Sequence, residues 1–191
     1  PVLWAFPHRH RRCIGRMMRP GQPLALLGRW LTEPFLAVFM FVLTMGVWHI
    51  PDYYDAAQGR SITHYVQHTM FFTTALLYWW PIIYPGRGRR RLSTGWALLY
   101  LLPPFLEGML IGALLTFAPD PLYETYAGLD VNPVWGLDAL SDQELGGLIM
   151  WVPGGLFFFI PLFGLFARLL REEDQSMRLK KQGPALKIES D

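Results

Sequence analysis

Three of the five histidines in this 191-residue chain lie within one short stretch, residues 47–72, with the sequence VWHIPDYYDAAQGRSITHYVQHTMFF. His64 and His68 are four residues apart, so they share one face of a helix. Met45 lies one helical turn before His49 and therefore on the same face. Imidazole binds copper, zinc or iron, and a nearby thioether favours copper. These residue types and spacings indicate a metal site.

Two carboxylates in the same stretch extend the candidate ligand set, because either can bind the metal or accept a hydrogen bond that fixes an imidazole tautomer. The lone Cys13 excludes a site built from several cysteines. Two alternatives remain open: histidines that only form hydrogen bonds at a membrane interface, and haem ligation by His49 with His64 or His68. The candidate metal ligands are His49, His64, His68, Asp52, Asp55 and Met45.

The elements that must position these residues are apolar enough to cross a membrane. The chain is 52% hydrophobic and only 17% charged, whereas about a quarter of a soluble domain is charged. Four long apolar stretches approach or reach the roughly 20 residues that a membrane span needs. We therefore predict an all-α polytopic membrane protein, a four-transmembrane-helix bundle. The stretches are 35–50, 65–86, 92–119 (interrupted only by Glu107) and 145–167.

The distribution of basic residues predicts the orientation of these spans. Residues 1–33, the GRGRRRLS loop and the tail from Arg168 together hold sixteen of the seventeen Lys and Arg, and Arg60 is the other. Because cytoplasmic loops are rich in Lys and Arg, both termini are predicted to be cytoplasmic, in a bacterial inner membrane. The predicted parts are a basic cytoplasmic or interfacial segment (1–33), a transmembrane domain (34–168) and a polar cytoplasmic tail (169–191).

This topology brings the histidines to one depth. The first span ends at His49, on the outer side, and the second begins there with His64 and His68, after a tight connection. The arginine runs are interpreted as topology and lipid contacts, not as a nucleic-acid site. Glu107 inside the third span is a functional candidate by default.

Local patterns predict further details of the later spans. Ser141-x-x-Glu144 has the spacing of a capping box at the start of the fourth span. The pair Pro103-Pro104 predicts a break in the third span, and Pro153 predicts one in the fourth. Glycines near them permit close helix contact, at Gly108 and Gly112 in the third span.

Four motifs resemble the CtaG-like family of assembly factors for haem–copper cytochrome c oxidases: WHIPDYYDAA, HYVQHTMFFTTALLYWWP, LLTFAPDPLYETY and SDQELGGLIMWVPGG. The resemblance covers about the last four spans of the family and so indicates a shortened form. It implies an all-helical protein that serves oxidase maturation, through copper delivery or insertion. The family's motif histidines fall on His49, His64 and His68, and its acidic positions on Asp52, Asp55 and Asp142.

The leading hypothesis is therefore a membrane assembly factor, not an enzyme, which holds copper at the outer face. The alternative is a structural accessory subunit of a respiratory or photosynthetic electron-transport complex. Expected partners are membrane lipids and subunits of such a complex, with no nucleic acid and no small-molecule substrate. Transport is disfavoured because paired broken helices and inverted repeats are missing from the pattern. No H-E-x-x-H, phosphate-loop or G-x-S-x-G motif is present.

Overall fold

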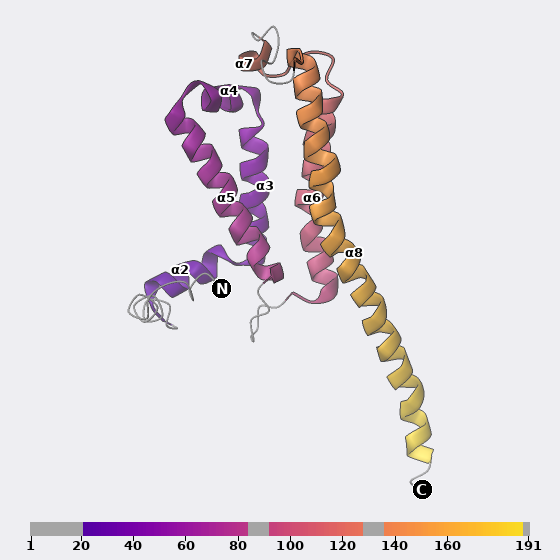
Figure 1. Cartoon of the computed structure of the whole chain (residues 1–191). Helices are drawn as coiled ribbons and strands as arrows, with labels where there is room; N and C mark the ends of the chain where they lie inside the picture. The colour runs from indigo at the N-terminus through magenta and orange to yellow at the C-terminus, as the bar shows by residue number, and fades with distance from the viewer. Residues whose placement is uncertain (1–20, 84–91, 128–135, 189–191) are drawn as a thin grey trace, which may run out of the picture.

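The computed structural model describes residues 21–83, 92–127 and 136–188, and all elements in these ranges are helices (Figure 1). Four long helices form two hairpins that stand side by side. α3 and α5 are antiparallel and joined by the short α4, while α6 and α8 form the second hairpin. The helices are α2 (Pro23–Leu31), α3 (Pro34–Trp48), α4 (Pro51–Gly59), α5 (Ser61–Ile83), α6 (Thr94–Thr116), α7 (Glu124–Ala127) and α8 (Ala139–Ile188).

α2 and α3 meet at a sharp bend of 64°. Pro34 is the first residue of α3. A backbone N–H at this position has no partner within the helix, so proline, which lacks the N–H, costs no hydrogen bond there. The Glu33 carboxylate caps the helix by accepting a hydrogen bond from the N–H of Leu36 at 2.9 Å. α2 therefore projects sideways from the lower end of the α3–α5 hairpin and is not a straight continuation of α3 (Figure 1). Residues 1–20 of the predicted basic segment lie outside the described residues.

Two helices in the described ranges are long and apolar enough to cross a membrane, α6 and the part of α8 from Ala139 to Lys180. The bent pair of α2 and α3 makes a third candidate if it is one span. α5 has the same length as α6, but its first two turns contain His64, Gln67 and His68, which reduce its apolar character. The chain is thus all-helical where it is described, with two or three candidate spans.

The connection between α3 and α5 differs from the tight loop that the sequence predicts. It forms a nine-residue helix, α4, which begins at Pro51 and has Asp52 in its first turn. Proline at the first position and an acidic residue near the N-terminus both favour a helix start. The same Pro51 that ends α3 after His49 therefore begins the next helix.

The predicted capping box of α8 is wrong by one turn. α8 begins at Ala139, and the Asp138 carboxylate accepts a hydrogen bond from the N–H of Ser141 at 2.7 Å. Hydrogen bonds from this turn lower the pKa of Asp138 below its ordinary value. Ser141 is already inside the helix because Asp138, three residues earlier, is the N-cap. The predicted breaks are also absent, since α6 and α8 continue through their prolines.

The two hairpins pack on each other around an aromatic core. Its buried members are Phe41 of α3, Tyr78 of α5, and Tyr100 and Leu101 of α6. The rings of Tyr78 and Tyr100 stack with centroids 4.9 Å apart, and the Tyr100 hydroxyl donates to the Tyr78 carbonyl at 2.7 Å. This contact ties α5 to α6.

α6 and α8 approach most closely at glycines. A Cβ added at Gly112 would lie 2.6 Å from the Cβ of Trp151, and one added at Gly147 would lie 2.7 Å from the Gly112 carbonyl oxygen. Gly108, which the sequence also predicts as a contact, has open space at its Cβ position. The close approach is therefore a pairing of Gly112 with Gly147 across the two helices.

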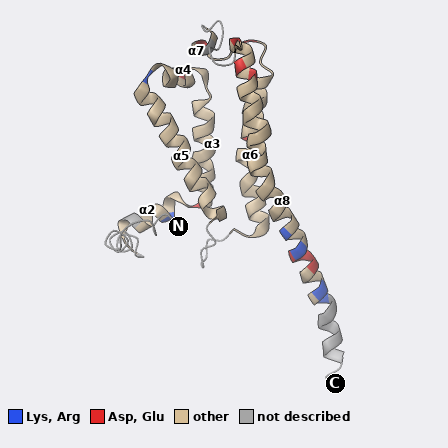
Figure 2. Cartoon of the chain, viewed as in Figure 1, with Lys and Arg blue, Asp and Glu red and all other residues tan. Residues whose placement is uncertain are grey.

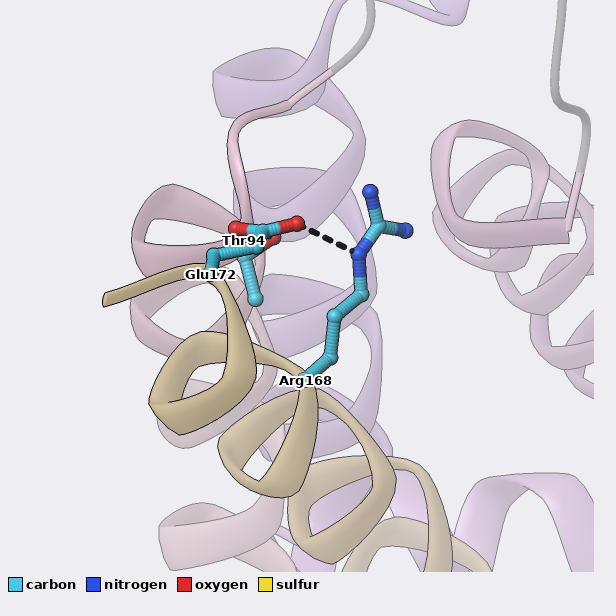
Figure 3. A network of polar contacts seen from close by, with 3 residues as sticks. All are labelled: Thr94, Arg168 and Glu172. Atoms are coloured by element: carbon cyan, nitrogen blue, oxygen red, sulfur yellow. Dashed lines mark hydrogen bonds and ion pairs between the residues drawn. The ribbon is translucent and has the colours of Figure 1, made fainter. Parts of the chain in front are cut away.

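A polar contact at the other end of α6 fixes the point where α8 leaves the bundle (Figure 3). The Thr94 hydroxyl donates to Glu172 at 2.8 Å, and the same carboxylate accepts from Arg168 at 2.7 Å. Beyond it, α8 projects as a polar helix (Figure 1). The predicted domain boundary after residue 168 falls within this continuous helix and stays a prediction.

Candidate metal and assembly site

His49 is the C-terminal cap of α3 and holds a defined tautomer. Its Nδ1 lies 2.7 Å from the carbonyl oxygen of Met45. Because a carbonyl only accepts, Nδ1 carries the proton and donates it, which leaves the lone pair of Nε2 available. A metal-binding histidine is oriented by this kind of hydrogen bond. The imidazole is partly buried, with its ring centroid 6.2 Å from that of Phe71 on α5.

His64 and His68 form a pair on α5, as their spacing predicts. Their ring centroids are 4.5 Å apart and the rings meet edge to face. His64 is partly buried and His68 is exposed. Two imidazoles at this separation on one helix face fit a metal that takes nitrogen ligands, copper among them.

The structure places all three histidines at the end of the hairpin that carries α4, but it does not gather them into one cluster. Among the residues it describes, no three His, Cys, Asp or Glu side chains form a group that can hold a metal ion. His49 packs near Phe71, which is three residues beyond His68 on α5. Met45 lines a cavity between the helices. Metal binding by these residues therefore stays a prediction.

The two aspartates of the candidate set have different surroundings. Asp52 is exposed in the first turn of α4. Both carboxylate oxygens of Asp55 accept backbone hydrogen bonds, from Glu124 at 3.1 Å and from Thr125 at 3.0 Å. Asp55 thus caps the start of α7 from another helix. Slight burial raises its pKa, but the hydrogen bonds from Thr125 and Glu124 outweigh it and hold the pKa below the ordinary value.

Further contacts connect α4 to the segment before α7, and we call them, with the Asp55 cap, the α4–α7 junction. The Tyr54 and Tyr123 rings stack with centroids 4.0 Å apart. The Tyr123 hydroxyl donates to the carbonyl of His49 at 3.3 Å. The backbone at the candidate histidine is therefore held by a residue that is 74 positions later in the chain.

Gln143 joins this junction to the second hairpin. This buried side chain accepts from the N–H of Leu122 at 2.7 Å and donates to the carbonyl of Leu115 at 3.3 Å. It therefore connects the start of α8, the end of α6 and the segment before α7. A small pocket of ≈ 220 Å³ lies beside it and includes Asp142, Gly146 and Gly147 in its lining.

Sequence reasoning missed the structural part of this site. Tyr54, Tyr123 and Gln143 are not metal ligands or charged groups, so residue type alone does not single them out. The available signal was their position: each lies in one of the motifs WHIPDYYDAA, LLTFAPDPLYETY and SDQELGGLIMWVPGG. The structure shows that these three motifs, which are far apart in the chain, meet at one end of the molecule.

The comparisons with known proteins give a family. The family model described as cytochrome c oxidase caa3 assembly factor matches residues 1–172 of the 191. No curated protein and no solved structure gives a significant match. Because the family match covers most of the chain, the protein belongs to the cytochrome c oxidase caa3 assembly factor family. Together with the candidate membrane-spanning helices, this membership indicates a membrane protein that serves cytochrome oxidase assembly.

Proposed function

We propose that this member of the caa3 assembly factor family holds copper at the outer face of a bacterial inner membrane and supplies it to the maturing oxidase. The observation that carries the proposal is the His64–His68 pair, whose rings lie 4.5 Å apart on one face of α5. Imidazole nitrogens suit copper. When bound, copper is the cargo and the chain itself performs no catalytic reaction.

The role of His49 in this proposal follows from its tautomer. Its Nδ1 proton is held by the Met45 carbonyl, so the lone pair of Nε2 is available to bind copper separately from the His64–His68 pair. Asp52, three residues later in the first turn of α4, is exposed and supplies negative charge for a cation. Asp55 acts mainly through the backbone, because both of its oxygens already cap α7.

The proposed topology has four spans, with α3, α5, α6 and α8 each crossing once and both termini in the cytoplasm. The charged residues in the described ranges support this topology (Figure 2). Acidic residues gather around α4, α7 and the start of α8, whereas most of the described basic residues lie on the far extension of α8, interspersed with acidic ones, and near α2. Arg60, between α4 and α5, is the exception. The other basic runs, in residues 1–20 and 84–91, lie outside the described residues.

The α4–α7 junction supports this proposal by giving the outer end a fixed shape. The Tyr54–Tyr123 stack and the Asp55 cap hold α4 against α7. Preorganised ligands lose less conformational freedom when they bind an ion than mobile ones do. An oxidase subunit would meet this rigid, acidic end when it receives copper.

Copper analysis of the intact protein, purified in mild detergent, tests the proposal. The double variant His64→Ala/His68→Ala should lose bound copper and slow the maturation of the oxidase in cells. A double variant of the two histidines in the N-terminal segment, His8→Ala/His10→Ala, is the matched control and should keep both properties. If the metal-free protein and the His64/His68 variant support oxidase maturation as well as the wild type, copper handling is not the function. Stable co-purification with an oxidase at fixed stoichiometry, without copper, would identify an accessory subunit instead.

A further inference from the structure

A cavity of ≈ 420 Å³ lies between the two hairpins and is lined by residues of α3, α5, α6 and α8. Its walls are almost entirely apolar, with Phe41, Phe71 and Phe158 among them. Three methionines from three different helices line the same space: Met45 of α3, Met109 of α6 and Met150 of α8.

Methionine often fills irregular gaps in cores, because its side chain is long and flexible. Here, however, the three methionines border a space that remains open. The sulfur of Met109 reaches the backbone of α8, where a Cβ at Gly155 would lie 3.8 Å from it. Thioether sulfur is a soft, neutral ligand and selects Cu(I) among the biological metals. The cavity thus offers ligands suited to a soft monovalent cation.

A cation inside an apolar site needs a negative charge nearby, because burying an unpaired charge is costly. Glu107 lies next to two cavity-lining residues in sequence, Gly108 and Met109. Its Oε1 is close to α3, since a Cβ at Gly46, beside Met45, would lie 3.2 Å from it. Its Oε2 is buried and has no hydrogen-bond partner in the described part of the chain. The carboxylate therefore lies between α6 and α3, next to segments that line the cavity, and one of its oxygens has no hydrogen-bond partner among the described residues.

The cavity is also linked to His49. The carbonyl of Met45 accepts the Nδ1 proton of His49 at 2.7 Å, while the Met45 side chain lines the cavity. Phe71 contacts the His49 ring and lines the cavity as well. The cavity is therefore linked to His49 through Met45, one helical turn earlier in α3, and through Phe71 of α5.

We propose that Met45, Met109 and Met150 form a Cu(I) site inside this cavity, with Glu107 as the counter-charge. The inference rests on the proposed copper-handling function and adds a second, sulfur-lined position below the histidines. The histidines meet copper at the surface of the molecule, and the thioethers hold it between the hairpins. No electron transfer is required, because the ion enters and leaves as Cu(I).

The test is X-ray absorption of the intact protein in detergent, loaded with Cu(I) alone under anaerobic conditions. The wild-type spectrum should contain a shell of sulfur neighbours. The triple variant Met45→Leu/Met109→Leu/Met150→Leu conserves volume and should lose that shell. The matched control replaces three methionines that do not line the cavity, Met40, Met70 and Met177, and should keep it.

Glu107→Gln keeps the size of the side chain but removes its charge. It should weaken Cu(I) binding roughly ten- to twentyfold, the effect of one unit charge about 10 Å away at an effective dielectric constant near 20. A wild-type spectrum with nitrogen or oxygen neighbours only would overturn the proposal without any variant, as would an unchanged sulfur shell in the triple variant. If a lipid acyl chain fills the cavity instead, the wild-type spectrum should contain nitrogen or oxygen neighbours only.

The same spectra separate this inference from the proposed function. In His64→Ala/His68→Ala the nitrogen shell should decrease and the sulfur shell should persist. A wild-type spectrum that has the nitrogen shell but no sulfur shell contradicts the methionine site and leaves the proposed function standing. A nitrogen shell absent from the wild type contradicts the histidine site and the proposed function.

Discussion

The substitution Gly147→Ala tests the contact that holds α8 against α6. A Cβ at this position would lie 2.7 Å from the Gly112 carbonyl oxygen, 2.7 Å from the Thr116 Oγ1 and 2.8 Å from the Leu115 Cβ. Real Cβ atoms essentially never come within 3.0 Å of such neighbours. One of the three is a backbone atom and another is a Cβ, so rotation of a side chain does not relieve the overlap. The two helices must move apart.

The neighbouring residue provides a matched control, because a Cβ at Gly146 meets nothing within 4 Å. Both substitutions gain up to about 1 kcal/mol of helix propensity, so this gain cancels in the comparison. Only Gly147→Ala adds the overpacking cost of about 1–3 kcal/mol. We therefore expect the free energy of unfolding of Gly147→Ala to be lower than that of Gly146→Ala by about 1–3 kcal/mol.

Unfolding of the purified protein by increasing dodecyl sulfate in mixed micelles gives this difference, with helical circular dichroism as the signal. Tryptophan fluorescence provides a second signal near the contact, since Trp151 also packs against Gly112. Equal stability of Gly146→Ala and Gly147→Ala would refute the close approach of α6 and α8 at this point.

Other predictions concern the α4–α7 junction. Asp55→Asn leaves one acceptor oxygen for two backbone N–H groups at the start of α7, so one hydrogen bond is lost; this should cost about 1 kcal/mol, measured as thermal stability at pH 7. The folded-state pKa of Asp55 is lowered from 3.8. The contribution of Asp55 to stability is therefore fully present above pH 3.8 and should disappear as the pH falls through the lowered pKa. A stability difference between wild type and Asp55→Asn that does not depend on pH would contradict this. Gln143→Leu leaves the Leu122 N–H and the Leu115 carbonyl without their partner, and should cost about 1–3 kcal/mol for each group that stays unsatisfied. Hydrogen exchange of the Leu122 amide should increase in that variant, and an unchanged rate would show that Gln143 does not hold it.

Much of the arrangement around the histidines follows from local sequence rules. The apolar stretches and Pro51 predict where α3 ends, and the spacing of His64 and His68 predicts their shared face on α5. These rules work because helix period and proline geometry depend only on neighbouring residues. The structure confirms the helical class and the His64–His68 pair.

Most of what sequence reasoning did not predict depends on contacts between distant residues. Asp55 looks like a metal ligand in the sequence, but its partners are amides about 70 positions away. Gly112 resembles half of a motif with Gly108, whereas its actual partner is Gly147 on another helix. The start of α8 at Ala139 depends on a competition between two nearby capping residues, which residue type alone does not decide. The first two outcomes depend on contacts between helices, whereas the third is a local choice between two caps three residues apart.

The copper content of the oxidase itself tests the central claim most directly. Oxidase purified from cells that lack this chain should contain less copper than oxidase from wild-type cells. The wild-type chain should restore the copper, and His64→Ala/His68→Ala, present at the same level in the membrane, should not. Fully copper-loaded oxidase from cells that contain only the double variant would contradict the account.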